Sequence, residues 1–271
     1  MMREDLTAEE AKAIRACGAA MAEAARAVIL PHFRTAMTAD NKAAPGGFDP
    51  VTVADRAAEE AIRAVLAERR PQDAILGEEF GRQAGESGLT WVLDPIDGTR
   101  AFISGTPSWG VLIALQDARG PFYGIIDQPY TAERFEGGLG TARLAGPRGE
   151  SPLRVREGVA LDGATLFTTF PEVGTEAEGA AFRRVAREVR LTRYGLDCYA
   201  YALLALGQID LVIEAGLQSY DIAAPIAVIE AAGGVVTDWE GGPVHEGGRA
   251  LAAATPELHR AAMALLAGQG A

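Results

Sequence analysis

The chain has 271 residues, 48% of them hydrophobic and 23% charged, which suits a globular protein with one large core or two closely packed lobes. Its formal net charge of −12 argues against nucleic-acid and anionic-membrane partners, whose phosphates would be repelled, although a small phosphate ester stays compatible with it. Two cysteines cannot make a disulfide framework and indicate a cytoplasmic protein, and we expect neither a signal peptide nor a membrane span.

Two helices are expected in the first 70 residues. A capping box at Thr7–Glu10 begins an amphipathic pattern that ends near Pro31, and a second helical pattern fills 51–70. Asp55 lies at the front of the second helix, where a carboxylate is commonly a cap or a partner of the helix dipole. The polar, glycine-rich segment 38–50 between the helices is predicted to be either a plain connection or an active-site flap.

Acidic residues follow two short apolar runs in the next stretch. The run 74–77 is expected to be a strand that delivers Glu78 to the end of a sheet. The run Trp91–Leu93 is expected to be the end of a buried strand, so that Asp94 lies where the strand stops. The two segments are close in the chain, which makes a shared acidic site a reasonable hypothesis.

The string from Asp94 to Arg100 combines two carboxylates with a turn. Pro95 cannot donate to a sheet ladder and forces a turn, which brings Asp97, three residues on, toward Asp94. The residues 98–102 can then open a helix whose first N–H groups point outward. This string offers carboxylates to a hard cation and amide donors to a phosphate, whereas Asp-Pro or Asp-Gly alone would mark only a surface turn.

Strand signals dominate the middle of the chain. Short β-like runs separated by turn residues fill 109–144 and predict an antiparallel sheet. The Gly- and Pro-rich segment 146–152 is expected to separate two lobes, 1–147 and 148–271. In the second lobe we expect alternating elements, with strands at 165–169, 209–214 and 235–237 and helices at 176–189, 198–206, 221–233 and from Pro256 onward.

Four acids share a placement at a strand end or at the mouth of a helix, namely Glu78, Asp94, Asp97 and Asp221. Together they can form an all-oxygen site, which suits Mg²⁺ rather than Zn²⁺. Without cations, packing that many carboxylates would cost several kcal/mol of repulsion and desolvation. If the four side chains converge, a bound metal is therefore the simplest explanation.

Three motifs in chain order resemble the inositol monophosphatase family, whose members are Mg²⁺-dependent, lithium-sensitive phosphomonoesterases. The motifs are Ile75–Glu79, Trp91–Thr99, and Tyr220–Pro225 with Glu230–Gly234 behind it, and the likeness covers essentially the whole chain. The resemblance implies a mixed α/β protein with the layered αβαβα sugar-phosphatase fold, an antiparallel N-terminal sheet and a smaller C-terminal α/β lobe. It also implies one domain over 1–271, and a homodimer.

The resemblance further implies which residues hold the metal. Glu78, Asp94 and the backbone carbonyl of Ile96 would hold one Mg²⁺. Asp94, Asp97 and Asp221 would hold a second.

Other positions match the parts of the family site that act on phosphate and water. The amides of Gly98 and Thr99 would bind the phosphate, and Asp55 would work with Thr99 to activate the attacking water. The segment 38–50 would correspond to a mobile loop that can help hold a third, weaker Mg²⁺. The implied mechanism is direct in-line attack by water, without a phosphoenzyme.

Substrate choice is expected from residues that reach past the phosphate. Glu214 matches the acid that contacts the leaving group, while Arg100–Gly105 and Gly195–Tyr201 resemble the histidinol-phosphate phosphatase branch. Asp197 and Glu214 could then pair with the ammonium and imidazole of histidinol, whereas an inositol ring would offer only hydroxyls. Read locally, Asp197 would instead cap the following helix, and Arg100 would be a solvated surface charge.

L-Histidinol phosphate is the favoured substrate, and its hydrolysis to L-histidinol would belong to histidine biosynthesis. Inositol 1-phosphate or a broad set of sugar phosphates is the main alternative, followed by nucleoside 3′,5′-bisphosphate and fructose bisphosphate. A hypothesis of another class is an inactive phosphate- or metal-sensing protein. Its signature would be a missing metal ligand, and each expected ligand is present in the sequence.

Overall fold

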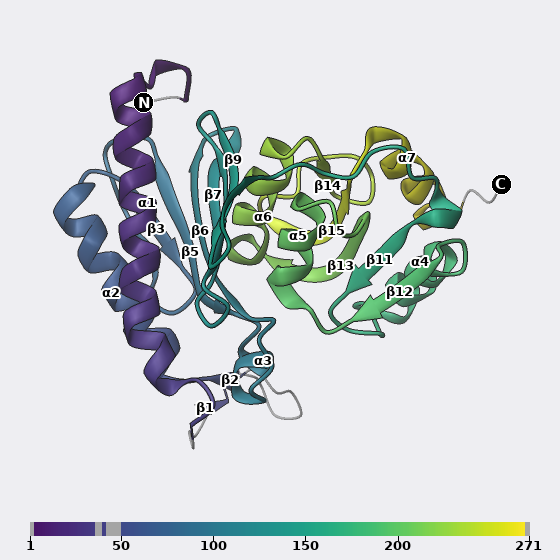
Figure 1. Ribbon diagram of the computed structural model, residues 1–271, viewed down its shortest axis with the longest axis horizontal. Coiled ribbons are helices and arrows are strands. Elements are labelled where there is room, and N and C mark those ends of the chain that lie inside the picture. The colour runs from purple at the N-terminus through teal and green to yellow at the C-terminus, as the bar shows by residue number, and fades with distance from the viewer. Residues whose placement is uncertain (1–2, 36–39, 42–49, 269–271) are drawn as a thin grey trace.

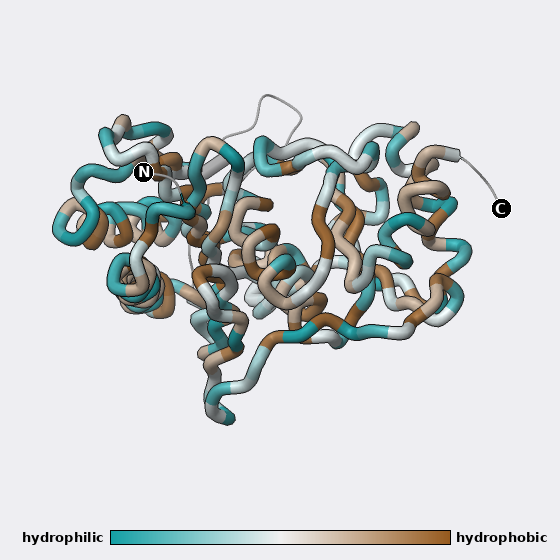
Figure 2. Tube along the Cα trace, turned by 90° about the horizontal axis from the view of Figure 1, so that it is seen from above, coloured by the Kyte–Doolittle hydropathy of each residue, from teal (hydrophilic) through white to brown (hydrophobic). Residues whose placement is uncertain are grey.

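The computed structural model describes residues 3–35, 40–41 and 50–268 of the chain. Five layers follow one another in the order helix, sheet, helix, sheet, helix, as Figure 1 shows. This confirms the mixed α/β fold with αβαβα layers. Hydrophobic residues gather between the layers, and hydrophilic residues lie along the periphery (Figure 2). Among the helices of the described residues, none is long and apolar enough to cross a membrane.

The first lobe consists of two long helices packed on an eight-stranded sheet. Helix α1 (Ala8–Ile29) begins at the predicted capping box, and α2 (Val53–Arg69) packs beside it. The strands run in the order β10-β9-β8-β7-β6-β5-β3-β4, and all neighbours are antiparallel except β3 and β5. These strands are β3 (Ala74–Gly77), β4 (Gly81–Gln83), β5 (Thr90–Asp97), β6 (Gly110–Asp117), β7 (Gly120–Gln128), β8 (Glu133–Gly138), β9 (Thr141–Gly146) and β10 (Gly149–Pro152).

The second lobe is built on a smaller, five-stranded sheet. Its order is β12-β11-β13-β15-β14, parallel over the first three strands and antiparallel over the rest. These strands are β11 (Thr165–Thr168), β12 (Leu191–Tyr194), β13 (Leu211–Gln218), β14 (Val235–Thr237) and β15 (Gly247–Ala253). Helices α4 (Glu176–Ala186) and α7 (Pro256–Leu266) pack together on the outer face of this sheet.

Helices α5 (Asp197–Ala205) and α6 (Ser219–Ala231) form the layer between the two sheets. Helix α6 contacts strands of both sheets, and its residues Ile222–Ile229 are all buried. Two glycines let it approach the first sheet closely. A Cβ on Gly124 would lie 2.6 Å from the carbonyl oxygen of Ala224, and one on Gly137 would lie 2.5 Å from the Cα of Val228.

Short elements complete the fold. Strands β1 (Asp40–Asn41) and β2 (Pro50–Val51) pair with each other, and α3 (Thr99–Ile103) follows β5. The remaining short helices are the 3₁₀ turns η1 (Arg3–Asp5), η2 (Leu30–His32) and η3 (Leu161–Gly163). Apart from these strands, the segment 38–50, with its predicted flap and third metal site, lies outside the described residues.

Two differences from the sequence prediction change how the first sheet is built. The segment 146–152 is not a linker, because Gly149–Pro152 forms β10 and pairs with β9 of the first sheet. Glycine and proline there mark the turn and edge of a hairpin, signals that a linker would share. Strand β5 does not end at Leu93 either. Its pairing with β3 stops there, but its pairing with β6 continues to Asp97.

Candidate active site

A cavity of about 270 Å³ opens where the two lobes meet. It is lined by the end of β5 and by α3 from the first lobe, and by β13, the loop after β11 and the N-terminal ends of α5 and α6 from the second. Almost all the predicted site residues lie on its wall: Glu78, Asp94, Ile96, Asp97, Gly98, Thr99, Arg100, Asp197, Glu214 and Asp221. Asp55 does not line the cavity and lies behind Thr99.

A β-bulge in β5 places Asp94 and Asp97 on the same side. Asp94 lies opposite Leu112 and Asp97 opposite Gly110, so three steps along β5 match two steps along β6. Side chains alternate between the faces of a regular strand, so residues three apart would point to opposite sides. The extra residue in β5 reverses that alternation, and both carboxylates reach the cavity.

Glu78 reaches Asp94 through the parallel pairing of β3 and β5. Gly77 pairs with Leu93, so the next residues along the two strands are neighbours. The turn that carries Glu78 is held by Glu59 of α2, whose buried carboxylate accepts the N–H groups of Glu79 at 2.7 Å and Phe80 at 3.3 Å. Sequence reasoning missed Glu59, because an acid four residues before Arg63 on a helix resembles an ordinary surface pair.

The carboxylates of Asp94, Asp97 and Asp221 form one cluster, with oxygens that all lie within 4.8 Å of one another. Burial raises the pKa of Asp94 well above its usual range, and the charge of Glu78 raises it further. Burial likewise raises the pKa of Asp97, followed by the charges of Asp197 and Asp221, against a 2.7 Å hydrogen bond donated by the Cys198 amide. The protein thus holds several mutually repelling carboxylates in a partly desolvated space.

The cluster fits a hard divalent cation. All its donors are oxygens, the donor type that Mg²⁺ prefers, and their repulsion is the property that a cation would relieve. A lone Asp on a strand end would ionise freely, whereas Asp94 and Asp97 have strongly raised pKa values. The donor set therefore supports a metal site, while the number of ions stays a prediction.

We expect the metal-free protein to lose stability as the pH rises from about 5 to 7.5. Burial raises the pKa of Glu214 from 4.5 to about 7 and that of Asp197 from 3.8 to about 6. An acid whose pKa is higher in the folded state binds more protons when folded, so its stabilising contribution is present at low pH and disappears as the pH passes through the folded pKa.

Thermal melting in a chelator should therefore show a midpoint several degrees lower at pH 7.5 than at pH 5. Mg²⁺ should raise the midpoint more at pH 7.5, because it competes with protons for the oxygens of Asp94 and Asp97, whose pKa values are also raised. The variant Glu214→Gln should flatten the dependence between pH 4.5 and 7. A metal-free midpoint that rises over this range would contradict the expectation.

Asp55 and Thr99 join α2 to the cavity. Asp55 is the third residue of α2, and its Oδ2 accepts the Thr52 amide at 2.7 Å and the Thr52 hydroxyl at 2.6 Å. Its Oδ1 faces the Thr99 hydroxyl at 3.4 Å. The helix cap favoured by the local sequence and the contact with Thr99 implied by the family resemblance are both present. Gly98, before Thr99, has φ +82°, a left-handed conformation that glycine adopts without strain.

Glu214 is a buried acid held in place by two threonines, Thr168 at the end of β11 and Thr169 directly after it. The Thr169 amide donates to its Oε1 at 2.7 Å, and the hydroxyls of Thr169 and Thr168 add bonds of 2.9 and 3.3 Å. These bonds lower the pKa of Glu214, but burial has the larger effect and raises it overall to about 7. The two threonines were predicted as part of a strand but not as part of the site.

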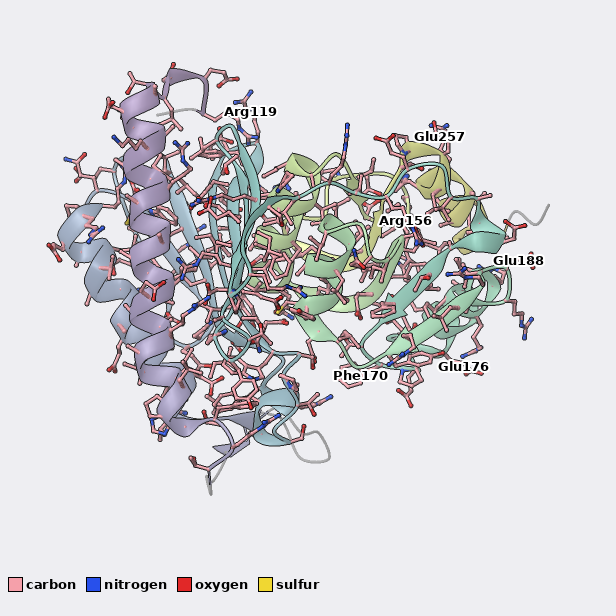
Figure 3. All side chains as sticks on the ribbon, viewed as in Figure 1. Arg119, Arg156, Phe170, Glu176, Glu188 and Glu257 are labelled. Carbon is pink, nitrogen blue, oxygen red and sulfur yellow. The ribbon has the colours of Figure 1, made fainter. Side chains whose placement is uncertain are left out.

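Asp197 and Arg100 both line the cavity. Asp197 has φ +47°, an uncommon conformation for a residue with a side chain, and accepts a 3.2 Å hydrogen bond from Ser108. The Arg100 guanidinium lies 4.9 Å from the ring centre of Phe170, an exposed side chain at the edge of the second lobe (Figure 3). Arg100 is therefore not simply a solvated charge, and sequence reasoning missed Phe170.

Tyr201 is another cavity residue without an assigned role in the sequence prediction. Its ring lies on α5, with 3% of the residue exposed. Burial raises its pKa well above the ordinary value, followed by the charges of Glu214, Asp97 and Asp221. Tyr201 belongs to the motif Gly195–Tyr201, but the spacing of the motif alone could not show which of its residues line the cavity.

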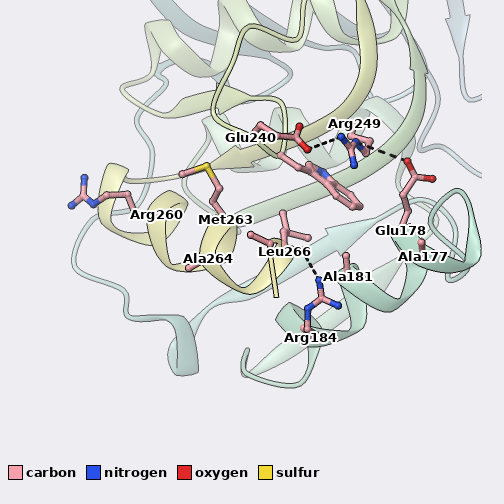
Figure 4. A pocket seen from close by; sticks show the side chains of 12 residues that line it. Ala177, Glu178, Ala181, Arg184, Glu240, Arg249, Arg260, Met263, Ala264 and Leu266 are labelled. Carbon is pink, nitrogen blue, oxygen red and sulfur yellow. Dashed lines mark hydrogen bonds and ion pairs between the residues drawn. The ribbon is translucent and has the colours of Figure 1, made fainter. Parts of the chain in front are cut away.

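A second cavity, of about 650 Å³, lies between α4, α7 and the loop before β15 (Figure 4). Its charged groups are already partnered. Arg249 bonds Glu240 at 2.6 Å, and Arg184 donates to the Leu265 carbonyl at 2.7 Å. Its wall lacks the clustered carboxylates of the smaller cavity, so volume is a poor guide to the site here.

Comparisons with known proteins find similarity over most of the chain. The sequence profile of the inositol monophosphatase family matches residues 10–270. The chain is 44% identical over 239 residues to an Arabidopsis thaliana protein named bifunctional phosphatase IMPL2, chloroplastic, across 88% of this chain and 67% of that one. It is 37% identical over 220 residues to a Streptomyces coelicolor histidinol-phosphatase, across 78% and 81%. A solved inositol monophosphatase structure from Zymomonas mobilis matches with a TM-score of 0.82 and 40% identity, across 93% and 96%.

Proposed function

Because the chain belongs to the inositol monophosphatase family and is a phosphoric monoester hydrolase, we propose that its substrate is L-histidinol phosphate, which it hydrolyses to L-histidinol and phosphate. The observation that carries this proposal is a pair of acids on the cavity wall that are not among the proposed metal ligands. Asp197 and Glu214 both line it, and both are carboxylates that an ammonium or imidazole could pair with.

The acids of the first lobe and Asp221 would hold Mg²⁺. We assign Glu78, Asp94 and the carbonyl of Ile96 to one ion, and Asp94, Asp97 and Asp221 to a second. When bound, the metal would neutralise phosphate charge and favour ionisation of the attacking water. A third, weaker ion near 38–50 remains part of the proposal.

The chain's own residues would handle the proton and the phosphate. The Thr99 hydroxyl can donate to Asp55, which leaves its oxygen lone pairs to accept a hydrogen bond from the attacking water. Asp55 would then take the proton that Thr99 passes on, while the Thr52 bonds keep its carboxylate in position. The amides of Gly98 and Thr99 would bind the phosphate for direct in-line displacement.

An inositol 1-phosphate or broad sugar-phosphate activity is the second candidate. It is favoured by the 40% identity to the inositol monophosphatase from Zymomonas mobilis, which is close to the values for the histidinol-phosphatase relative. The hydroxyls of an inositol ring could form hydrogen bonds with residues on the same wall. The ring carries no positive charge, however, that could pair with the two carboxylates. The acids therefore favour the amine-bearing ester.

Side-by-side kinetics on the two esters test the proposal. In saturating Mg²⁺, kcat/KM for L-histidinol phosphate should exceed that for myo-inositol 1-phosphate by at least about 10-fold, because a missing counter-ion leaves two partly buried carboxylates unpaired. An equal or reversed ratio would replace histidinol phosphate with the second candidate and leave the hydrolase class intact.

Oligomeric state and location are part of the proposal as well. A homodimer is the expected assembly, and sedimentation equilibrium would measure it. A cytoplasmic location is expected from the two free cysteines, although the plant relative is named as chloroplastic.

A further inference from the structure

The Tyr201 hydroxyl is a buried polar group without a hydrogen-bond partner among the described residues. Tyr201 is 3% exposed and lines the cavity together with Glu214, Asp97 and Asp221. Leaving a buried hydroxyl unpaired destabilises a folded protein, and native structures contain few such groups. A hydroxyl that stays unpaired at the wall of a site therefore points to a partner that arrives with the ligand.

Other tyrosines of the fold show what a structurally satisfied hydroxyl looks like here. Tyr199, two residues earlier on α5, donates to Glu133 at 2.6 Å, and Tyr123 donates to Glu136 at 2.9 Å. Two more unpaired buried atoms occur in the described part of the chain, on Trp109 and Gln116, but neither residue lines the cavity. Of these three residues, Tyr201 alone both lines the cavity and carries an unpaired buried polar atom.

The surroundings of the hydroxyl indicate which part of a ligand it meets. Tyr201 shares the cavity wall with Glu214, which we place on the side of the leaving alcohol, and with Asp97 and Asp221, which we place on the side of the metal and phosphate. A phosphomonoester that spans these two sides has one oxygen where they meet. This is the ester oxygen, which joins phosphorus to the alcohol carbon. A phenol keeps its proton near neutral pH and can donate a hydrogen bond to such an oxygen.

We propose that Tyr201 donates a hydrogen bond to the ester oxygen that leaves with the alcohol, and so stabilises the negative charge that develops there as the bond to phosphorus breaks. This inference rests on the proposed phosphomonoesterase function of the cavity, but not on the choice of histidinol. It makes Tyr201 a group that acts mainly in the transition state, because the charge on the oxygen is largest there.

The test compares an alkyl ester with an aryl ester in the full chain with Mg²⁺. Tyr201→Phe should lower kcat for the alkyl phosphate that the wild type hydrolyses fastest by about 10- to 100-fold, because an alkoxide needs the donor. It should lower kcat for p-nitrophenyl phosphate by less than about 3-fold, because that leaving group is already a stable anion. The control Tyr199→Phe should leave the alkyl-to-aryl ratio of kcat values at the wild-type level.

Thermal melting of the same variants in a chelator separates this role from a structural one. Tyr201→Phe should melt no lower than the wild type, since it removes an unpaired hydroxyl, whereas Tyr199→Phe should melt a few degrees lower because it loses its bond to Glu133. Equal losses on both esters, no loss on either, or a drop in melting temperature for Tyr201→Phe like that of Tyr199→Phe would overturn the proposal. If histidinol phosphate is not the substrate, the kcat/KM values of the wild type for the two esters will show it. If the role of Tyr201 is wrong, only the kcat values and melting temperature of Tyr201→Phe will show it.

Discussion

Asp97→Asn should lower kcat on the order of 10³-fold or more while the protein stays folded. Asp97 belongs to the cluster of three aspartates whose oxygens lie within 4.8 Å, so the neutral amide removes one charge from the expected metal site. The fold should tolerate the change, because an amide oxygen can still accept the hydrogen bond that the Cys198 amide donates to Asp97 at 2.7 Å. Steady-state kinetics at several Mg²⁺ concentrations measure the loss.

Thermal melting completes this experiment. In a chelator the variant should unfold no earlier than the wild type, because one repelling carboxylate has been neutralised, and Mg²⁺ should stabilise it less. Asp162→Asn, an exposed change in η3, is the matched control and should behave as wild type. Near-normal turnover of Asp97→Asn, or unchanged stabilisation by Mg²⁺, would remove the metal-site proposal.

Asp197→Asn should raise the KM for L-histidinol phosphate by about 10- to 100-fold and the KM for myo-inositol 1-phosphate by less than about 3-fold. The reason is the loss of the carboxylate that we pair with the substrate's cationic group. Asparagine is the right replacement, because Asp197 has φ +47° and asparagine adopts this left-handed conformation more readily than alanine. Its amide oxygen can also accept the hydrogen bond from Ser108.

Measuring kcat and KM for both substrates distinguishes a loss of substrate recognition by Asp197 from a general distortion of the cavity. A distorted cavity would impair both esters alike, with kcat falling as KM rises. The Asp162→Asn protein again provides the control for an acid-to-amide change away from the site. Equal increases in KM for both esters would contradict the role of Asp197 in substrate choice and leave the hydrolase assignment untouched.

Motifs confined to a short stretch of chain were the most predictable part of this protein. The string from Asp94 to Arg100 indicated an acidic site beside a helix start, and the structure places both on one cavity wall. The bulge that turns Asp97 toward Asp94 was not predictable, because it depends on the register with β6. The strand at 149–152 was not predictable for a related reason, since turn residues at 146–152 do not reveal whether the next residues pair.

Contacts between distant segments set the rest of the site. Glu59 holds the turn after Glu78 from another element, and Thr169 holds Glu214 across 45 residues of sequence. Neither partner carries a local signal that distinguishes it from a surface or strand residue. Tyr201 lies within the motif Gly195–Tyr201, but only the fold shows that this residue lines the cavity with the acids and that its buried hydroxyl lacks a partner among the described residues.

The close contact of α6 with the first sheet ties distant glycines to catalysis. Asp221 projects from the first turn of a helix whose height above β7 and β8 is set by the missing side chains of Gly124 and Gly137. Even a methyl group at either position would lift this helix and carry Asp221 away from Asp94 and Asp97. A mutational survey restricted to residues that touch substrate would overlook both positions. Natural variation at these glycines would change activity by moving α6, although neither residue lines the cavity.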